Sequence, residues 1–377
     1  MPVTPLPSDL QPARFIRHTV ELRRLVDRLR SQSLLAVDTE SNSLYAYYEK
    51  VCLVQLSTRE QDYIIDPLAI DDMSPLGDLL VDPAIEIVFH AAEYDIITLK
   101  RDYGYTFSHI FDTMLAARAC GWPAIGLGSI LADQFGVRAE KRYQRANWAT
   151  RPLPPEQLIY AQMDTHYLPE LRDRLYEELK AAGRLEESYE TFTQLAELSP
   201  AEHHFDPEGY WRINGVQDMR RSQMAVVREL YLARDEAAKR NDLPPFKVFT
   251  DGALLEIARL TPRRIEDLFG IKGLGGDQAR RYGERIISAV LRGQQAKPPR
   301  PPQRREAADP QVHARYEALR EWRKQRAAER GVESDVIVPR DTLWALAKRS
   351  PTCVEDLDDI PGLGPWRRAE YGEELIA

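Results

Sequence analysis

The residues best suited to chemistry begin with two carboxylates at the end of an apolar stretch. Leu34 to Val37 are small or apolar and lead directly into Asp38-Thr39-Glu40, a pattern typical of a strand buried on both faces. Because Asp38 and Glu40 are two residues apart, they point to the same side of an extended chain. Such a pair is costly to bury unless a cation or a shared proton offsets the charge, and oxygen ligands favour Mg²⁺ or Mn²⁺ over zinc. The alternative is that both acids begin a solvated loop.

Two further acids lie at places where a predicted fold can bring them to the first pair. Asp95 follows an apolar stretch at 85–89 and falls in the first turn of a helix expected over residues 92–103. An acid at that position is also favoured by the helix macrodipole alone. Asp164 follows Tyr160 by four residues, so on a helix both face the same way. The alternative for this pair is a core tyrosine beside a surface acid.

The elements that must position these residues are strands first and helices after. Apolar or alternating stretches bounded by turns predict four strands and a helix in the first half of the chain, followed by alternating helices and polar loops to about residue 180. The strands are expected at residues 34–40, 51–57, 63–66 and 85–89. This order predicts one sheet with packed helices, an α/β or α+β domain.

Asp38, Glu40, Asp95 and the Tyr160-x₃-Asp164 pattern together resemble the DEDD exonuclease superfamily in its tyrosine variant. The surrounding motifs are similar to the ribonuclease D family over about residues 15–195. The matching segments are Leu53-Val54-Gln55-Leu56, His90-Ala91, Asp112-Thr113, Trp148 with Arg151-Pro152-Leu153, and Tyr160-Ala161. One departure is Asn147, which stands before Trp148 where the family usually has Asp.

The resemblance implies an RNase H-like α/β domain that hydrolyses phosphodiesters with two divalent metal ions, Mg²⁺ or Mn²⁺. By resemblance, Asp38 bridges the two ions, while Glu40 and Asp164 complete one site. Asp95 then holds the second ion, and Tyr160 orients the attacking water. A phenol with an ordinary pKa of about 10 is a poor general base at neutral pH.

Basic and aromatic residues precede the Tyr160 helix and are candidates for nucleic-acid contact. Arg142, Arg145 and Arg151 are interleaved with Trp148, a combination that can follow a phosphate backbone and stack bases. The alternative is a solvated loop. His90 is a further candidate for substrate contact, with a purely structural role as its alternative.

The second half of the chain contains an internal repeat. The segment 253–258 with Pro262 recurs at 342–347 with Pro351, and Gly273-Leu274-Gly275 recurs as Gly362-Leu363-Gly364, at the same spacing. Each copy is expected to be a helical bundle opened by a long helix, at 219–240 and at 312–330. Both resemble the helicase-and-RNase-D C-terminal (HRDC) domain, which implies RNA binding by at least one copy. The Gly-x-Gly turns either present amides to phosphate or only connect helices tightly.

These patterns predict an exonuclease domain at 1–200, a first HRDC copy at 210–294, and a second copy at 309–377. The join at 295–308 is rich in proline and arginine, which predicts a semi-stiff spacer. The net charge of −8 counts mildly against a nucleic-acid protein, although an acidic metal site explains part of it. No apolar run approaches the roughly 20 residues that span a bilayer, so no membrane role is expected. Three widely separated cysteines indicate a reducing, cytoplasmic setting.

The function expected from the sequence is a 3′→5′ exoribonuclease that releases nucleoside 5′-monophosphates from single-stranded RNA 3′ ends. By resemblance, its substrates are tRNA precursors and other small structured RNAs, and the protein is expected to be a monomer. One alternative is a 3′→5′ DNA exonuclease, because the same acids serve both polymers and only contact with the ribose 2′-OH separates them. The other is a catalytically silent RNA-binding scaffold.

Overall fold

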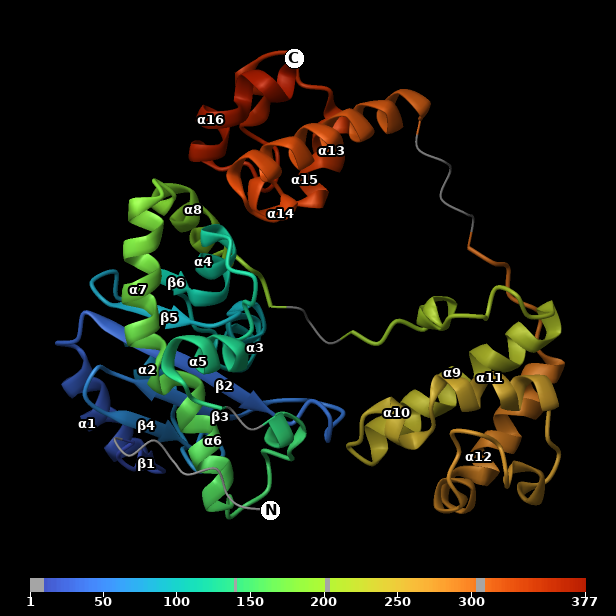
Figure 1. Ribbon diagram of the computed structural model, residues 1–377. Helices are drawn as coiled ribbons and strands as arrows, with labels where there is room; N and C mark the ends of the chain where they lie inside the picture. Colours follow the sequence, from blue (N-terminus) through green and yellow to red (C-terminus); the bar gives the residue numbers. More distant parts are fainter. Residues whose placement is uncertain (1–9, 139–140, 201–203, 303–308) are drawn as a thin grey trace. The chain divides into compact units, whose positions relative to one another are not determined.

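The computed structural model describes residues 10–138, 141–200, 204–302 and 309–377 (Figure 1). These residues form two compact units. Of the described residues, unit 1 contains 10–41, 51–138, 141–200 and 309–377, and unit 2 contains 42–50 and 204–302. The second repeat copy therefore belongs to the same unit as the domain that carries the acids, whereas the first copy belongs to the other.

A mixed sheet of six strands forms the centre of unit 1. Its order is β1-β4-β3-β2-β5-β6. The strands are β1 (Arg14–Ile16), β2 (Leu34–Ser41), β3 (Val51–Ser57), β4 (Asp62–Ile65), β5 (Glu86–Phe89) and β6 (Ile110–Asp112). Strand β2 lies in the middle, antiparallel to β3 and parallel to β5. Its residues from Leu34 to Val37 are at most 5% exposed, as expected for a strand covered on both faces.

Helices pack on this sheet and follow it in sequence. They are α1 (Thr19–Leu29), α2 (Ser74–Leu80), α3 (Glu93–Tyr103), α4 (Thr113–Cys120), α5 (Leu127–Phe135), the 3₁₀ helix η1 (Lys141–Arg145), α6 (Pro155–His166), α7 (Leu168–Ala181) and α8 (Leu185–Ala196). Helix α6 contacts β2, β3 and β4, whereas α7 contacts β2 and β5 (Figure 1). The predicted fold class is confirmed. Strands β1 and β6 were not predicted because three residues are too few to show a period.

The second copy is a helical bundle with a hydrophobic core of its own. It consists of α13 (Pro310–Arg330), α14 (Ser334–Ile337), α15 (Arg340–Arg349), η4 (Val354–Leu357) and α16 (Pro365–Ile376). Helix α16 contacts α8. This placement against the exonuclease domain was not foreseen from the sequence, because nothing in the repeat itself indicates what each copy packs on.

Unit 2 contains the first copy, with the same order of elements. They are α9 (Arg221–Arg240), α10 (Pro245–Val248), α11 (Asp251–Leu260), η3 (Ile265–Leu268) and α12 (Gly276–Gln295), and an additional 3₁₀ helix, η2 (Gly209–Arg212), precedes them. The loop 42–50, which follows β2 in sequence, is part of this unit. Its Tyr47 belongs to the core of the unit and donates a 2.7 Å hydrogen bond from its hydroxyl to Asp235.

The recurrence of long helix, short helix, helix, 3₁₀ helix and helix in both copies agrees with the predicted repeat. The predicted domain limits stay predictions. Of the predicted spacer at 295–308, residues 303–308 lie outside the described part of the chain. Within the described residues, no helix is long and apolar enough to cross a membrane.

Candidate metal centre

Three carboxylates converge where β2 meets α6. Asp38, Glu40 and Asp164 can each present one oxygen such that all three atoms lie within 4.8 Å of one another. Asp38 and Glu40 come from the end of β2, where the pairing with β3 shifts register immediately after Glu40. Bulges of this kind are common beside active sites, where they redirect side chains. The predicted spacing of two on the strand therefore does bring both acids to one side.

Helix α6 is fixed to the sheet by polar contacts on residues other than its site residues. The Thr165 and Ser57 hydroxyls are 2.7 Å apart, and Gln162 donates to the Asp62 carboxylate over 2.6 Å. His166 Nδ1 is 2.8 Å from the same Asp62 carboxylate. These contacts set the rotation of α6, so that Tyr160 and Asp164 face β2. His166 thus has a structural role in the described contacts.

Asp95 lies in the first turn of α3 and is 6% exposed. One of its oxygens accepts hydrogen bonds from the backbone N–H and the hydroxyl of Thr39, at 3.0 and 2.5 Å. Thr39 stands between Asp38 and Glu40 on β2. Asp95 is therefore held against the strand that carries the other acids, and its charge raises the pKa of Asp38. We call Asp38, Glu40, Asp95 and Asp164 the acid cluster.

The turn before α3 is shaped by a buried carboxylate. Asp112, 1% exposed, accepts hydrogen bonds from the backbone N–H groups of Ala91 and Ala92 at 3.3 and 2.7 Å. It also caps α4 by accepting from the N–H groups of Met114 and Leu115. Ala91 has φ of +62°, a left-handed conformation that residues with a Cβ rarely adopt. The Asp112 bonds hold this turn and thereby set where α3 begins, with Asp95 in its first turn.

Burial and mutual repulsion raise the pKa values of the acid cluster. The pKa of Asp38 is raised well above its usual range, first by burial and then by the charges of Asp95, Asp164 and Glu40. Burial, with the charges of Asp164 and Asp95, raises the pKa of Glu40 to about 9. Burial likewise raises the pKa of Asp164 to about 8 and of Asp95 to about 7. A hard divalent cation relieves this repulsion, so the donor set fits Mg²⁺ or Mn²⁺.

Tyr160 is placed beside the cluster as a hydrogen-bond donor. It is bonded to Asp164, four residues further along α6. Burial, followed by the nearby carboxylates, raises the pKa of its hydroxyl, so the phenol keeps its proton at neutral pH. The rings of Tyr143 and Trp148 each lie 5.9 Å from the Tyr160 ring. These two aromatic side chains fix the orientation of the tyrosine.

Two of the residues expected to contact nucleic acid are used inside the domain instead. Trp148 is 1% exposed and packs in a small core with Tyr160, so its ring has no free face on which a base could stack. Arg151 donates to both oxygens of the buried Asp66 carboxylate, each at 2.7–2.8 Å, and to the Cys52 carbonyl. The sequence did not indicate these internal contacts, because a polar, arginine-rich stretch does not reveal which side chains turn inward.

The remaining candidates are more accessible. Arg142 and Arg145 are exposed residues of η1, and the Arg142 guanidinium lies 4.6 Å from the Tyr143 ring centroid. Asn147 accepts from the Ala149 N–H at 3.2 Å, a local turn that an aspartate would also form. Asn147, which stands where the family usually has Asp, therefore keeps this contact with the Ala149 N–H.

His90 follows β5, two residues after Val88, the partner of Ala36 in β2. His90 and Asp38 thus leave neighbouring parallel strands at one edge of the sheet. Its Nδ1 is 2.9 Å from the hydroxyl of Thr113, which itself donates to the Phe89 carbonyl. Because a hydroxyl has one hydrogen, His90 must donate from Nδ1. Burial lowers the pKa of the ring, so its Nε2 is left as an acceptor.

Gln55 is a residue whose role the sequence did not suggest. It pairs with Asp38 across the β2–β3 ladder, is 0% exposed, and its amide oxygen and nitrogen have no hydrogen-bond partner among the described residues. Opposite residues of an antiparallel pair share a face, so this amide lies on the face of the acid cluster. A polar residue in the middle of an otherwise apolar strand was the available signal.

Comparison with known proteins finds family matches for the acid-bearing domain and for both repeat copies. The 3′-5′ exonuclease family profile matches residues 13–180, and the HRDC domain profile matches residues 223–290 and 312–377. A ribonuclease D from Gluconacetobacter diazotrophicus is 31% identical over 371 residues, which cover 96% of this chain and 92% of that protein.

Two solved structures resemble the fold over much of the chain. The structure of Escherichia coli RNase D, an exoribonuclease involved in structured RNA processing, matches with a TM-score of 0.69 and 26% identity, covering 97% of this chain and 98% of that one. The catalytic core of RRP6 from Trypanosoma brucei matches with a TM-score of 0.71 and 29% identity, covering 78% and 83%.

Proposed function

From the premise that this chain belongs to the ribonuclease D family and is a metal-dependent 3′→5′ exoribonuclease, we propose that the acid cluster is its active site. The observation that carries the proposal is the convergence of three half-buried carboxylates within 4.8 Å. An arrangement of this kind is unfavourable as a purely structural feature, because each ionised acid raises the pKa of the others. A metal-binding role gives a reason for the cost.

The donor set fits two divalent ions, Mg²⁺ or Mn²⁺. Asp38 is affected by the charges of the other three acids. It is proposed to be the shared ligand, with Glu40 and Asp164 completing one ion site and Asp95 the other. Ions bound there would lower the pKa of a water and stabilise the leaving oxygen of the phosphodiester. The chain's own contribution is to hold the carboxylates in place through Thr39, the β2 bulge and the contacts that pin α6.

Tyr160 is proposed to orient the attacking water. Its hydroxyl is protonated and bonded to Asp164, and its ring packs near two other aromatic rings. It therefore acts through a hydrogen bond rather than as a base. Tyr160→Phe should reduce kcat on RNA roughly 10- to 100-fold, as loss of a positioning group does, while the affinity for Mn²⁺ is unchanged. An unchanged kcat at saturating metal would show that the hydroxyl takes no part.

The 3′ end of the RNA is proposed to lie along the exposed edge near His90 and η1. His90 Nε2 is an acceptor and can receive a ribose hydroxyl, whereas Arg142 and Arg145 can contact phosphates. Hydrolysis there would release nucleoside 5′-monophosphates. We further propose tRNA precursors and other small structured RNAs with single-stranded 3′ ends as substrates, and action as a cytoplasmic monomer.

The direct test uses a 5′-labelled RNA with a single-stranded 3′ tail, incubated with Mg²⁺, with Mn²⁺ and with chelator. A ladder that shortens from the 3′ end, disappears with chelator and is absent with Asp38→Asn is expected. A DNA strand of the same sequence is the control for sugar preference, and an equally rapid ladder on DNA would move the substrate assignment to DNA. Normal shortening by Asp38→Asn would remove the acid cluster from the chemistry.

A further inference from the structure

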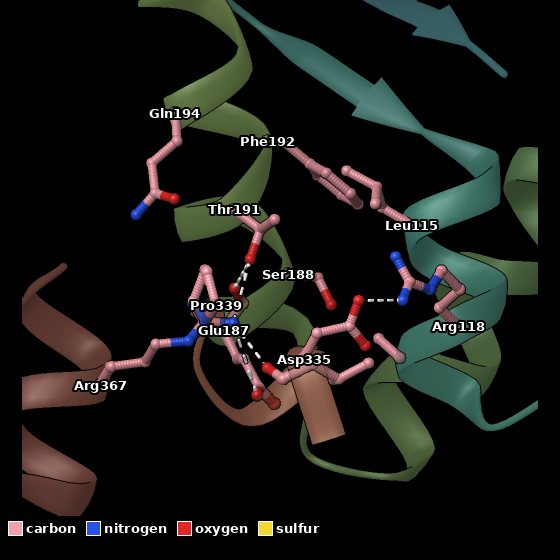
Figure 2. Close-up of a pocket in the computed structure, with 12 residues that line it drawn as sticks. Leu115, Arg118, Glu187, Ser188, Thr191, Phe192, Gln194, Asp335, Pro339 and Arg367 are labelled. Atoms are coloured by element: carbon pink, nitrogen blue, oxygen red, sulfur yellow. Dashed lines mark hydrogen bonds and ion pairs between the residues drawn. The ribbon is translucent and has the colours of Figure 1, made fainter. Parts of the chain in front are cut away.

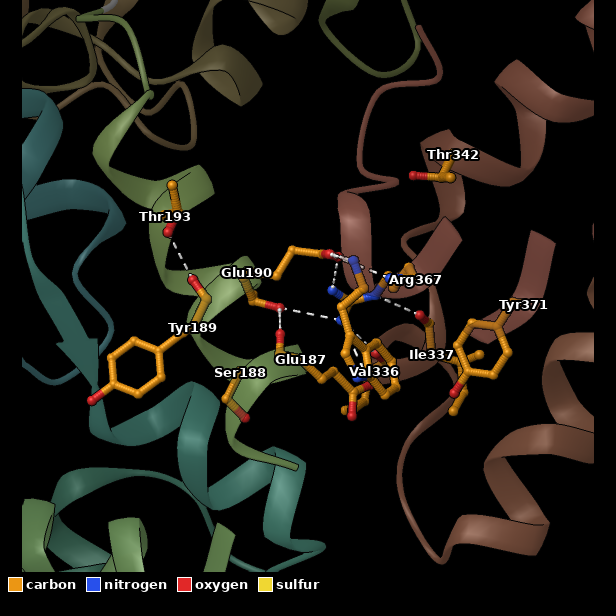
Figure 3. Close-up of polar contacts among 12 residues, drawn as sticks. Glu187, Ser188, Tyr189, Glu190, Thr193, Val336, Ile337, Thr342, Arg367 and Tyr371 are labelled. Carbon is orange, nitrogen blue, oxygen red and sulfur yellow. Dashed lines mark hydrogen bonds and ion pairs between the residues drawn. The ribbon is translucent and has the colours of Figure 1, made fainter. Parts of the chain in front are cut away.

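One face of α8 is acidic and covered by the second HRDC copy (Figure 3). Glu187 is 1% exposed, and the side chain of Glu190 is 7% exposed. Thr191 follows on the same helix. We call Glu187, Glu190 and Thr191 the docking face. Two carboxylates buried this deeply are stable only when they are paired and hydrogen-bonded, so their partners decide what this surface is for.

Arg367, in the first turn of α16, reaches the docking face and is 4% exposed. Its guanidinium is 2.8 Å from Glu190 and 3.2 Å from the Thr191 hydroxyl. Its Nε donates to the Ile337 carbonyl at 2.8 Å, within the second copy (Figure 3). The arginine is therefore held by its own bundle and presented, already oriented, to α8.

Arg330, the last residue of α13, forms the second contact. Its guanidinium meets both oxygens of Glu187, at 2.5 and 3.0 Å. The charges are reversed nearby, where Arg118 of α4 pairs with Glu333 at 2.9 Å. Arg118 also pairs with Asp335, as Figure 2 shows. Acidic and basic groups thus alternate on both sides of the contact. Such a pattern selects one partner and one register.

Glu190 also occupies the amino-terminal end of α16. Its second oxygen accepts hydrogen bonds from the backbone N–H groups of Trp366 and Arg367, at 2.6 and 3.3 Å. These groups follow the Gly362-Leu363-Gly364 turn after Pro365, where the sequence left open a contact with phosphate. A helix amino terminus attracts anions, and here the anion is a carboxylate of the same chain. The turn of the second copy is therefore used for docking.

The first copy lacks the residues that make this contact. The two copies align without gaps, and a shared contact verifies the alignment: Arg234 donates to the Phe249 carbonyl as Arg323 donates to the Val338 carbonyl, at 3.2 and 3.0 Å. In this alignment, the positions of Arg330 and Arg367 are held in the first copy by two uncharged residues. These are Asn241 and Gln278.

Gln278 has a different task from that of its counterpart. Its amide oxygen accepts from the Gly275 N–H at 2.7 Å, and its nitrogen donates to the Lys247 carbonyl at 2.7 Å. The first copy thus caps its own helix with an uncharged side chain. It has no cation at either position with which to neutralise Glu187 and Glu190.

We propose that the docking face of α8 is a surface dedicated to the second HRDC copy, which binds it through Arg330 and Arg367. This copy then works as a fixed part of the catalytic unit, and the turn before α16 serves docking rather than RNA phosphate. The proposal is independent of the proposed roles of the acid cluster, because none of its residues belongs to that cluster.

The test is hydrogen–deuterium exchange of the full chain, followed in peptides from α8 and α16. The variant Glu187→Gln/Glu190→Gln alters no contact inside the second copy. It leaves the buried Arg367 and the half-buried Arg330 without their glutamate counter-charges. Removing one partner of a buried pair is strongly destabilising, so exchange at these two helices should rise roughly a hundredfold. The matched control is Glu374→Gln, which neutralises an exposed glutamate paired with Arg326 inside the second copy and should change exchange less than about threefold.

A second variant identifies the partner. Arg367→Gln installs the residue of the first copy and should expose α8 as much as the double glutamate variant, and combining all three substitutions should add little. Unchanged protection of α8 in the glutamate variant, with the chain folded, would overturn the proposal. Protection that grows with protein concentration would assign the docking to a second chain and overturn it as well. Loss of protection on addition of RNA would return the α16 turn to phosphate binding.

Discussion

Neutralising Asp38 should make the metal-free protein more stable while abolishing its activity. Asp38→Asn keeps the shape of the side chain and removes the carboxylate whose pKa is raised by burial and by three neighbouring acids. Ligand oxygens of Asp38, Glu40 and Asp164 lie within 4.8 Å of one another. At an effective dielectric constant of about 20, two full charges at that distance repel by about 3.5 kcal/mol.

The metal-free cluster retains some protons at pH 8, so the repulsion relieved is smaller than for full charges. We expect the free energy of unfolding of the exonuclease domain to rise by about 1–3 kcal/mol in chelator, which corresponds to several degrees in the thermal midpoint. Saturating Mn²⁺ should stabilise the wild type, as any ligand specific for the native state does. The same addition should leave Asp38→Asn almost unchanged.

Thermal unfolding at pH 8, with chelator and with Mn²⁺, measures both effects. Asp71→Asn is a matched control because Asp71 is exposed and lies outside the acid cluster. It should move neither midpoint measurably. The reasoning would be refuted if Asp38→Asn were less stable than the wild type in chelator, or if Mn²⁺ stabilised both proteins equally.

Three further expectations concern pH, Gln55 and Arg151. In chelator, the free energy of unfolding should fall as pH rises from about 5 to 9. The native cluster, with pKa values raised to about 7 to 9, holds protons that unfolded acids have released; chemical denaturation at several pH values measures this, and a rise would contradict it. Gln55→Leu should stabilise the metal-free protein by about 1–3 kcal/mol, because an unpartnered amide is no longer buried. The same substitution should also lower the affinity for Mn²⁺ roughly tenfold, as measured by calorimetry. An unchanged Mn²⁺ affinity would make Gln55 purely structural. Arg151→Gln should lower the free energy of unfolding by about 2–3 kcal/mol, since Asp66 loses its partner. The RNA affinity of the folded fraction should stay the same. Selective loss of RNA binding would instead support the predicted contact of Arg151 with nucleic acid.

The order of the elements and the residues of the acid cluster could be predicted because their signals are local. Spacings of two on a strand and four on a helix place Asp38 with Glu40, and Tyr160 with Asp164, on one side of their elements. That β2 and α6 then meet depends on contacts such as Gln162 with Asp62, which no local pattern reveals.

The features that the sequence did not reveal likewise depend on contacts between residues distant in the sequence. Trp148 and Arg151 were expected to contact nucleic acid, yet their contacts inside the domain are with Tyr160 and Asp66, which lie at other points in the sequence. The docking of the second copy depends on single residues, Arg330 and Arg367, within a repeat that otherwise keeps its pattern. A repeat shows what two copies share, whereas their separate tasks lie in the positions where they differ.

The central claim is that the acid cluster holds two divalent ions, and calorimetric titration of the metal-free protein with Mn²⁺ tests it most directly. Two ions per chain are expected for the wild type, with proton release on binding because the raised pKa values of the cluster are lowered by the cation. Asp38→Asn should lose both ions, since the shared ligand is neutralised. Full occupancy in that variant, or a wild type that binds no ion at the cluster, would contradict the account.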